Sequence, residues 1–511
     1  MALPRYLSTV IISLGWIVGN QEVYSQPPAV VKQFEDAVKA AAAKAEHAIA
    51  SIQVSRSPKY KELGAAPETD LPGKLGNFFL PSEPQRRRGF GFRQQQPNPN
   101  AWLDLSSPES VPDSFGSGVV VDSSGLVLTL AHVVKDAVKI YVRFSGGAGS
   151  YADIHALDGR SDLAVLRLLN PPEGLAVLPM GDPSTLAKGQ FAILMSNSFA
   201  SGFRDGSPAV SWGMVSNLRR KLTSTVREAE RNQLSLYHYG TLIQADAAVK
   251  PGISGGALLD FEGRWVGILT THAAWTGADS SQAFAIPLDR MHRGILEKLK
   301  GGEEVDYGFL GVQIQPHFPG ATGVQISNVT AGSPAQRAGI TRGDTITGIN
   351  GEPIRHPDDL FLHVGGALAG SNAKVEIVRG FGDARQVLQV KLAKFANANQ
   401  VIASKQPPAL FGIRADYSSI ISQVAFGQDR FNYFPEGVAV REVVPGSPAD
   451  KGKIQQGNLI TRVNDQPVTT PQEYLNAVAK SGKQVKITIH LHNGGEDILH
   501  LEMPAGPGSN P

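Results

Sequence analysis

One sequence pattern occurs twice in the C-terminal third of the chain. The segment that begins at Gly323 reads GVQISNVTAGSPAQRAGITRGDTITGINGEPIRHPDDL, and the segment that begins at Gly437 reads GVAVREVVPGSPADKGKIQQGNLITRVNDQPVTTPQEY. The two align without a gap, which indicates two tandem copies of one structural unit. We therefore predict two related domains and a short tail. Their bounds are 305–394 and 409–504, with a linker at 395–408 and the tail at 505–511.

Short β-branched runs fill the chain between Phe115 and Ile286. They include GSGVVVDSSGLVLTLAHVV, VKIYVRF, DLAVLRLL, GQFAILM and RWVGILTT, separated by Gly and Asp residues. Many short strands joined by turns are typical of an all-β barrel or sandwich. We predict a β-rich core at 115–300 that ends in a helix. A helix and first strand at 26–57 and a long mobile loop at 58–114 precede it.

The first 25 residues have the pattern of an export signal. Arg5 precedes an apolar run at 7–19, and small residues up to Ser25 suit signal-peptidase cleavage near Gln26. The run is shorter than the roughly 20 residues that a membrane span needs. We predict that residues 1–25 are a signal peptide, with an uncleaved anchor as the alternative, and that the protein is exported to the periplasm or cell envelope.

Composition limits the possible functions. The 511 residues include 48 basic and 46 acidic side chains, so the formal net charge of +2 gives no general attraction to nucleic acid. Cysteine is absent, which excludes disulfides, thiolate metal sites and a cysteine nucleophile. His490 and His492 alternate on a predicted strand, where a solvated strand face explains them better than a metal site. We predict no cofactor and no metal.

A serine in a glycine-rich loop is the candidate nucleophile. Ser254 lies in PGISGGALL, where the other interpretation is a simple turn residue. His132 follows the apolar run VLTLA, and Asp162 precedes the run LAVLRL. Histidine, aspartate and serine then stand in the chain order of chymotrypsin-like proteases. A serine nucleophile needs a base that accepts its proton and an acid that orients the base, and these two residues supply both.

These blocks resemble the protease core of the HtrA (Deg) family of serine proteases. The match depends on GSGVVVDSSGLVLTLAHVVKDA, DGRSDLAVLRL, IQADAAVKPGISGGALLDFEGRWVGILT and QAFAIPLD, in the family's order. The resemblance implies a mainly β fold with a chymotrypsin-like double β-barrel, in which His132 is the general base, Asp162 orients it and Ser254 attacks the scissile carbonyl. It also implies an oxyanion hole formed by Gly252, Ile253 and Ser254.

Two departures from the family pattern lie just before the serine. Ile253 stands where the family has Asn or Asp, and Val249–Gly252 reads VKPG where the family has INPG. A β-branched residue disfavours unusual backbone angles, so we expect Ile253 to disturb the oxyanion donors in the resting loop. Loss of one such donor costs about 2.7–4 kcal/mol of barrier, so low or inducible activity is the expected consequence.

The repeated units resemble the two α+β PDZ domains of the same family. Each carries a short apolar string with a glycine. The strings are Phe309-Leu310-Gly311-Val312 and Leu410-Phe411-Gly412-Ile413. In PDZ domains a peptide adds a strand to a sheet edge while backbone N–H groups of such a loop bind its C-terminal carboxylate. We expect peptide contacts at both strings. The first domain is the stronger expected binder, because DYSSIISQVAFGQDRFNYFPEG delays the next strand of the second.

The resemblance implies an exported serine endopeptidase that degrades unfolded or damaged proteins and whose PDZ domains capture peptides and regulate activity. Family members form homotrimers or multiples of trimers. The expected partners are therefore substrate proteins, PDZ-bound peptides and further copies of the chain, but not nucleic acid; membrane proximity is expected only with an uncleaved signal. Two alternatives are a non-proteolytic chaperone or PDZ scaffold with a site impaired by Ile253, and a site-specific regulatory protease.

Overall fold

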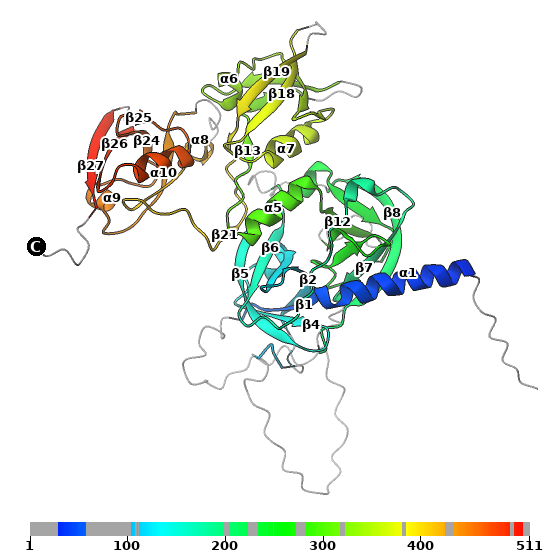
Figure 1. The fold of residues 1–511 in the computed structure, drawn as a ribbon. Helices are drawn as coiled ribbons and strands as arrows, with labels where there is room; N and C mark the ends of the chain where they lie inside the picture. The colour runs from blue at the N-terminus through cyan, green and yellow to red at the C-terminus, as the bar shows by residue number, and fades with distance from the viewer. Residues whose placement is uncertain are drawn as a thin grey trace, which may run out of the picture.

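The structure is a computed structural model, drawn in Figure 1. It describes residues 29–57, 104–107, 110, 112–198, 204–222, 234–248, 250–271, 282–316, 322–380, 385–424, 434–490 and 495–503. The predicted signal peptide at 1–25, most of the predicted loop at 58–114 and the predicted tail at 505–511 lie outside these ranges. Among the described helices, none is both long enough and apolar enough to cross a membrane.

Two closed β-barrels follow each other in the N-terminal part. The first contains β1 (Ile49–Ser55), β2 (Ser114–Asp122), β3 (Leu126–Leu130), β4 (Lys139–Phe144), β5 (Gly149–Asp158) and β6 (Leu163–Leu168). Its strand order is β5-β4-β1-β2-β3-β6, and β6 pairs with β5 to close it. The second contains β7 (Phe191–Ser196), β8 (Ala209–Arg220), β9 (Leu242–Ala245), β10 (Ala257–Leu259), β11 (Trp265–Thr270) and β12 (Ala283–Pro287), closed in the order β10-β11-β12-β9-β8-β7. The predicted double β-barrel is confirmed.

Two helices flank the barrels. Helix α1 (Ala29–Ala45) leads into β1 as predicted and contacts β7 of the second barrel (Figure 1). Helix α5 (Arg290–Lys300) follows β12, and the Asp289 side chain caps it by accepting a hydrogen bond from the N–H of His292. The buried face of α5 packs against β5 and β6. The end of the second barrel is thereby attached to the first.

Two repeat domains follow and share one topology. The first contains β13 (Gly308–Phe309), β14 (Val312–Ile314), β15 (Val324–Val329), α6 (Pro334–Arg337), β16 (Thr345–Ile349), β17 (Glu352–Pro353), α7 (Pro357–Gly366), β18 (Asn372–Val378), β19 (Arg385–Lys391) and β20 (Ala393–Lys394). The second contains β22 (Ile413–Tyr417), α8 (Ser419–Val424), β23 (Val438–Val443), α9 (Pro448–Lys451), β24 (Leu459–Val463), β25 (Gln466–Pro467), α10 (Pro471–Ala479), β26 (Gln484–His490) and β27 (Glu496–Glu502). The order β14-β15-β16-β18-β19 is matched by β22-β23-β24-β26-β27, so the sequence repeat is a structural repeat.

Local sequence explains why the two copies fold alike. Ser333 and Ser447 of the GSPA strings cap α6 and α9 through their side-chain oxygens, and proline follows at the first helical position. Asn350 and Asn464 occupy equivalent turns with φ of 53° and 50°. Asparagine tolerates this left-handed conformation better than most residues. Each repeat therefore carries its own helix start and turn signals.

The last hairpin, formed by β26 and β27, carries His490. In its register His490 pairs with Glu496 and Ile489 pairs with Asp497. His492 lies outside the described residues. Within the described part of the chain, no group of three or more His, Asp or Glu side chains is placed to hold a metal ion.

The predicted linker at 395–408 contains a strand. β21 (Val401–Ala403) pairs antiparallel with the end of β5 and so joins the sheet of the first barrel. Figure 1 shows β21 beside β5, on the path between the first and second repeat domains. The segment between the repeat domains is therefore packed on the barrel.

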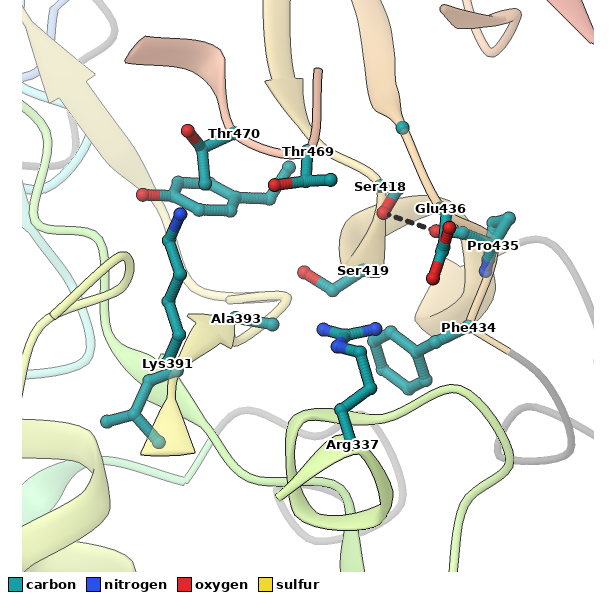
Figure 2. Close-up of a pocket in the computed structure, with 13 residues that line it drawn as sticks. Arg337, Lys391, Ala393, Ser418, Ser419, Phe434, Pro435, Glu436, Thr469 and Thr470 are labelled. Carbon is teal, nitrogen blue, oxygen red and sulfur yellow. Dashed lines mark hydrogen bonds between the residues drawn. The ribbon is translucent and has the colours of Figure 1, made fainter. Parts of the chain in front are cut away.

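A cleft of about 240 Å³ lies between the two repeat domains (Figure 2). Arg337 and Lys391 of the first domain face Ser418, Glu436 and Thr470 of the second across it. The two domains also touch each other directly through Phe434.

Phe434 of the second repeat domain is buried against the first. Its ring stacks on that of Phe309 with centroids 5.4 Å apart, and its N–H donates to the carbonyl of Ala331 at 2.8 Å. The ring of Phe309 in turn lies 6.2 Å from that of Phe395, the first residue of the predicted linker. Aromatic contacts therefore run from the second repeat domain through the first to the linker.

Candidate active site

The three residues predicted from the sequence meet between the two barrels. His132 lies in the short helix α2 (Ala131–Val134) directly after β3, Asp162 directly precedes β6, and Ser254 lies in the loop before β10. The Nδ1 atom of His132 is 2.7 Å from Oδ2 of Asp162, and its Nε2 atom is 3.0 Å from Oγ of Ser254. A continuous hydrogen-bonded chain thus links carboxylate, imidazole and hydroxyl.

Asp162 has an unusual backbone conformation. Its φ of 59° lies in the left-handed region, which residues other than glycine populate sparsely, although Asp does so more often than most. Its carboxylate also accepts the N–H of His132 at 3.0 Å, and its carbonyl accepts the N–H of Ala131 at 2.8 Å. These bonds aim the carboxylate at Nδ1 of His132. With the proton on Nδ1, the Nε2 atom is left to accept the proton of Ser254.

The surroundings of His132 favour the protonated ring. Burial opposes its charge, but the negative charge of Asp162 and the hydrogen bond to it prevail, so the pKa of His132 is raised above its ordinary value of 6.5. A raised pKa strengthens the imidazole as a base for the serine proton. The ring must be neutral to accept that proton, so activity would fall as the pH drops through this pKa.

Two glycines shape the loop that carries Ser254. Gly252 has φ of 90° and Gly255 has φ of 88°, and a Cβ on Gly255 would lie 2.0 Å from the carbonyl oxygen of Ser117. Both left-handed conformations thus fall on glycine, which adopts them without strain. Ile253 has no positive φ and is buried with 3% exposed. The expectation that Ile253 strains this loop is therefore wrong.

The N–H groups of the loop divide into two kinds. The N–H of Ile253 donates to the carbonyl of Lys250 at 3.4 Å, which closes a turn. Among the described residues, no acceptor is found for the N–H of Gly252 or of Ser254. Those two amides are available to a negative oxygen, whereas the predicted contribution of Ile253 is not supported.

Ser117 of β2 ties the first barrel to this loop. Its Oγ donates to the carbonyl of Gly252 at 2.7 Å, and its N–H donates to the carbonyl of Ser254 at 2.8 Å. The same Oγ accepts the N–H of Asn197 at 2.7 Å. The sequence analysis did not identify Ser117 or Asn197 as part of the site, because the residues that they contact there are distant in the chain.

The comparisons with known proteins agree with this geometry. The model of the trypsin-like peptidase domain matches residues 116–268, and the model of the PDZ domain matches residues 325–379 and 440–490. A probable periplasmic serine endoprotease, DegP-like, from a Marinomonas species is 30% identical over 389 residues, which cover 74% of this chain and 76% of the relative. The chain belongs to the HtrA (DegP-like) family of serine endoproteases.

Other relatives extend over nearly the whole chain. The DegP-like endoprotease of Pseudomonas putida strain GB-1 is 26% identical over 510 residues, covering 97% of this chain and 98% of the relative. The solved structure "HtrA-type protease AlgW with tripeptide" is 22% identical, covers 73% of this chain and 98% of its own, and has a TM-score of 0.47. The two repeat domains of this HtrA protein are its PDZ domains.

A fourth side chain of the HtrA site contacts Ser254. Thr271 directly follows β11, its Oγ1 lies 2.9 Å from Oγ of Ser254, and its N–H donates to the same oxygen at 3.1 Å. Because the Ser254 hydroxyl is directed at Nε2 of His132, both Thr271 groups can donate to lone pairs of Oγ, the atom that attacks the substrate. The sequence analysis missed Thr271, since its only signal was a position just beyond a buried strand.

The string at 309–312 forms a fixed loop in the first PDZ domain. Gly311 has φ of 83°, and a Cβ there would lie 2.3 Å from Cβ of Ser333, so only glycine fits. Leu310 is buried, and its carbonyl accepts the N–H of Ala335 at 2.9 Å. The loop is thus held from the side of α6, next to β14.

The string at 410–413 folds differently in the second PDZ domain. Phe411 and Gly412 have φ of 53° and 87°, and the N–H of Ile413 donates to the carbonyl of Leu410 at 2.9 Å. This internal bond occupies an N–H group of the kind that binds a peptide carboxylate. No corresponding bond is found within the described first loop.

We expect Thr271→Val to raise kcat about two- to tenfold, because a hydrogen bond that weakens as Ser254 attacks typically contributes about 0.5–1.5 kcal/mol. Valine keeps the shape of threonine and the backbone N–H. Initial rates on an unfolded protein substrate measure the effect. Thr271→Ser keeps the hydroxyl and serves as the control, with a rate near that of the parent. A Thr271→Val rate below the parent would mean that the hydroxyl orients Ser254 rather than restraining it.

Proposed function

We propose that this HtrA protein is an exported endopeptidase that hydrolyses unfolded or damaged proteins in the periplasm through Ser254, His132 and Asp162. The observation that carries the proposal is the hydrogen-bonded chain between these side chains, with distances of 2.7 and 3.0 Å. The relatives are named periplasmic, and the apolar run at 7–19 supports export through a signal peptide.

In this proposal, hydrolysis proceeds in two halves. Oγ of Ser254 attacks the carbonyl carbon of the peptide bond while its proton moves to Nε2 of His132, and Asp162 stabilises the imidazolium. The N–H groups of Gly252 and Ser254 stabilise the negative oxygen of the tetrahedral intermediate. His132 then protonates the leaving amine, and the C–N bond breaks. Water repeats the sequence on the acyl-enzyme, releases the acid and restores Ser254.

The geometry favours this proposal over the inactive scaffold. The scaffold alternative depends on strain at Ile253, yet the left-handed conformations of the loop fall on Gly252 and Gly255. Ser254 and His132 lie within hydrogen-bond distance of each other. A site-specific regulatory protease would use the same three residues and differs only in the proteins it accepts.

Degradation of casein by the mature chain tests the activity. We expect hydrolysis by the parent and a loss of at least about 10³-fold in Ser254→Ala, since the nucleophile is removed and its pocket is kept. Gel analysis of casein fragments over time measures it. No hydrolysis by either form, together with labelling of Ser254 by a fluorophosphonate, would replace general degradation by site-specific cleavage. Absence of both hydrolysis and labelling would support the scaffold.

We further propose that the first PDZ domain captures apolar C-terminal segments of substrates and that the second contributes less. The support is the difference between the two loops: the N–H of Ile413 is bonded to Leu410, whereas the loop at 309–312 has no such internal bond among the described residues. A captured peptide would lie along β14 as an added strand. Capture next to the protease domain raises the local concentration of substrate at Ser254.

Peptide binding to the full-length Ser254→Ala protein tests this assignment. We expect Val312→Glu to weaken binding of an apolar peptide with a free C-terminus at least about tenfold, because the new charge repels the carboxylate and enters the apolar pocket. Fluorescence anisotropy of a labelled peptide measures it. Gln313→Glu adds the same charge at the next, exposed position and should bind normally, and an amidated peptide should bind weakly to all forms. Equal binding by Val312→Glu and the parent would contradict the assignment.

We also propose that the protein assembles as a homotrimer or a multiple of trimers. The family resemblance suggests this state, and an apolar patch supports self-association. Phe191, Trp212 and Met214 of the second barrel are 38%, 51% and 41% exposed. Phe34 of α1 contacts the rings of Phe191 and Trp212, so the patch extends onto this helix. Exposed apolar patches of this kind mark interaction surfaces.

Sedimentation velocity tests the assembly. At micromolar concentration we expect the parent to sediment as a trimer or larger and Trp212→Glu to shift toward the monomer, because a charge at this surface opposes burial. Val387→Glu changes an equally exposed apolar residue of β19, 59% exposed, and should leave the assembly unchanged. A monomeric parent would contradict the proposal.

A further inference from the structure

Asp162 depends on a buried turn for its position. The turn runs from Asp158, the last residue of β5, to Asp162, and Arg160 and Ser161 within it are 5% and 1% exposed. The φ of Asp162 lies in the left-handed region, which residues other than glycine populate sparsely, although Asp does so more often than most. Such a conformation persists only where the surrounding structure enforces it. The contacts of this turn therefore decide whether Asp162 faces His132.

The carboxylate of Asp158 organises the turn. It accepts hydrogen bonds from the N–H and the Oγ of Ser161, at 2.8 and 2.6 Å. Its other two partners come from outside the first barrel. The hydroxyl of Tyr307 donates at 2.5 Å, and Nδ2 of Asn397 donates at 3.2 Å. Tyr307 directly precedes β13 of the first PDZ domain, and Asn397 lies in the segment between the PDZ domains.

Arg160 is enclosed by the same two segments. Its guanidinium lies 4.1 Å from the ring centroid of Phe395 and 4.9 Å from that of Tyr307. The N–H of Phe395 donates to the carbonyl of Tyr307 at 2.8 Å, which holds the two aromatic residues together. Cation–π contacts are strongest where the cation is desolvated, as it is here. The carboxylate of Asp158 and the guanidinium of Arg160 thus both contact residues outside the barrel.

The segment between the PDZ domains also contacts the turn through its backbone. The N–H of Gly159 donates to the carbonyl of Gln400 at 2.8 Å, and a Cβ on Gly159 would lie 2.9 Å from Cβ of Asn399. β21 then pairs with residues 156–158 of β5. β4 pairs only with residues 149–151 of β5, so this edge of the end of β5 is free for β21. The side chain of Ile402 packs on the barrel core.

Both ends of the segment are anchored. Before it, Lys394 is buried and forms ion pairs of 2.8, 2.7 and 3.0 Å with Glu304, Asp306 and Asp416, the last from the second PDZ domain. After β21, the N–H of Ser404 donates to the carbonyl of His155 at 3.0 Å. The segment is therefore bonded at one end to both PDZ domains, through Lys394, and at the other end to the first barrel, through Ser404.

We propose that residues 395–404, together with Tyr307, are a positioning element of the active site, which holds the turn at 158–162 so that the carboxylate of Asp162 stays on His132. The inference rests on the proposed roles of Asp162, His132 and Ser254. It makes the segment between the PDZ domains part of the catalytic apparatus. A displacement of that segment, or of the second PDZ domain to which it is joined through Lys394, then lowers the reactivity of Ser254.

The double variant Tyr307→Phe/Asn397→Ala tests the inference in the full-length chain with little change in packing. It removes the two outside hydrogen bonds to Asp158, together with the two that Asn399 donates to Oδ1 of Asn397 within the same segment. We expect kcat on a peptide substrate to fall on the order of tenfold or more, since small displacements of a catalytic group are costly, with KM nearly unchanged. The acid limb of the kcat/KM profile should move to lower pH. The charge of Asp162 raises the pKa of His132, so a displaced carboxylate raises it less.

The acid limb separates positioning from simple loss of folded protein. A smaller folded fraction lowers the plateau of the profile and leaves the limb where it is in the parent. The inference is overturned if the double variant has the kcat of the parent and an acid limb at the same pH. It is also overturned if the plateau of kcat/KM is lower but the acid limb stays at the same pH as in the parent. Ser254→Ala, assayed beside it, must be inactive; activity in that variant would instead overturn the proposed function.

A second pair of variants tests the strand itself. Ile402→Asp places a charge where the side chain packs on the barrel core, and Gln406→Asp places the same charge at an exposed position four residues further on. We expect Ile402→Asp to reproduce or exceed the loss of kcat and the shifted limb, and Gln406→Asp to match the parent. Equal behaviour of the two would show that docking of β21 does not affect the site and would overturn its part in the inference.

Discussion

The hydrogen bond between Asp162 and Nδ1 of His132 fixes the tautomer of the imidazole, and Asp162 makes it from a left-handed backbone conformation. Residues other than glycine populate that conformation sparsely and keep it where the surrounding contacts hold it. The turn at 158–162 is therefore buried, bonded internally through Asp158 and Ser161, and enclosed by residues from after the second barrel. The backbone conformation of one residue, Asp162, is thus held by contacts from several parts of the molecule.

Ser254 is positioned differently from Asp162. The loop around Ser254 places its left-handed residues at Gly252 and Gly255, so it carries no comparable strain. Ser117 crosses from the first barrel to bond the loop at two carbonyls, and Thr271 contacts Oγ of Ser254 from the end of β11. The loop that carries Ser254 thus uses glycines, which adopt positive φ readily, whereas the turn that carries Asp162 is held by the contacts around it. That turn is the part of the site that contacts Tyr307 and the segment between the PDZ domains.

The two PDZ domains share a repeated sequence pattern but differ in the loops at 309–312 and 410–413. Both copies keep the capped helices α6 and α9 and the same strand order, because these depend on local signals that the repeat preserves. Their loops differ, since Phe411 takes a left-handed conformation and Ile413 bonds to Leu410. The second domain instead makes extensive contacts with the first, through Phe434 and the ion pairs of Lys394.

Residue type and order by themselves indicated a β-rich domain, the repeated domains and the three residues that meet between the barrels, because strand periodicity, the internal repeat and the order of His132, Asp162 and Ser254 can be read along the chain. The resemblance to the HtrA family, and not the strand pattern, distinguished a double β-barrel from a sandwich. Sequence reasoning misjudged Ile253, since which residue of a loop takes a positive φ depends on the contacts around it. It also missed Ser117, Thr271 and the strand β21. These contacts join parts of the chain that are distant in sequence and meet only in the folded protein, so only the tertiary structure decided how Asp162 is held and what holds it.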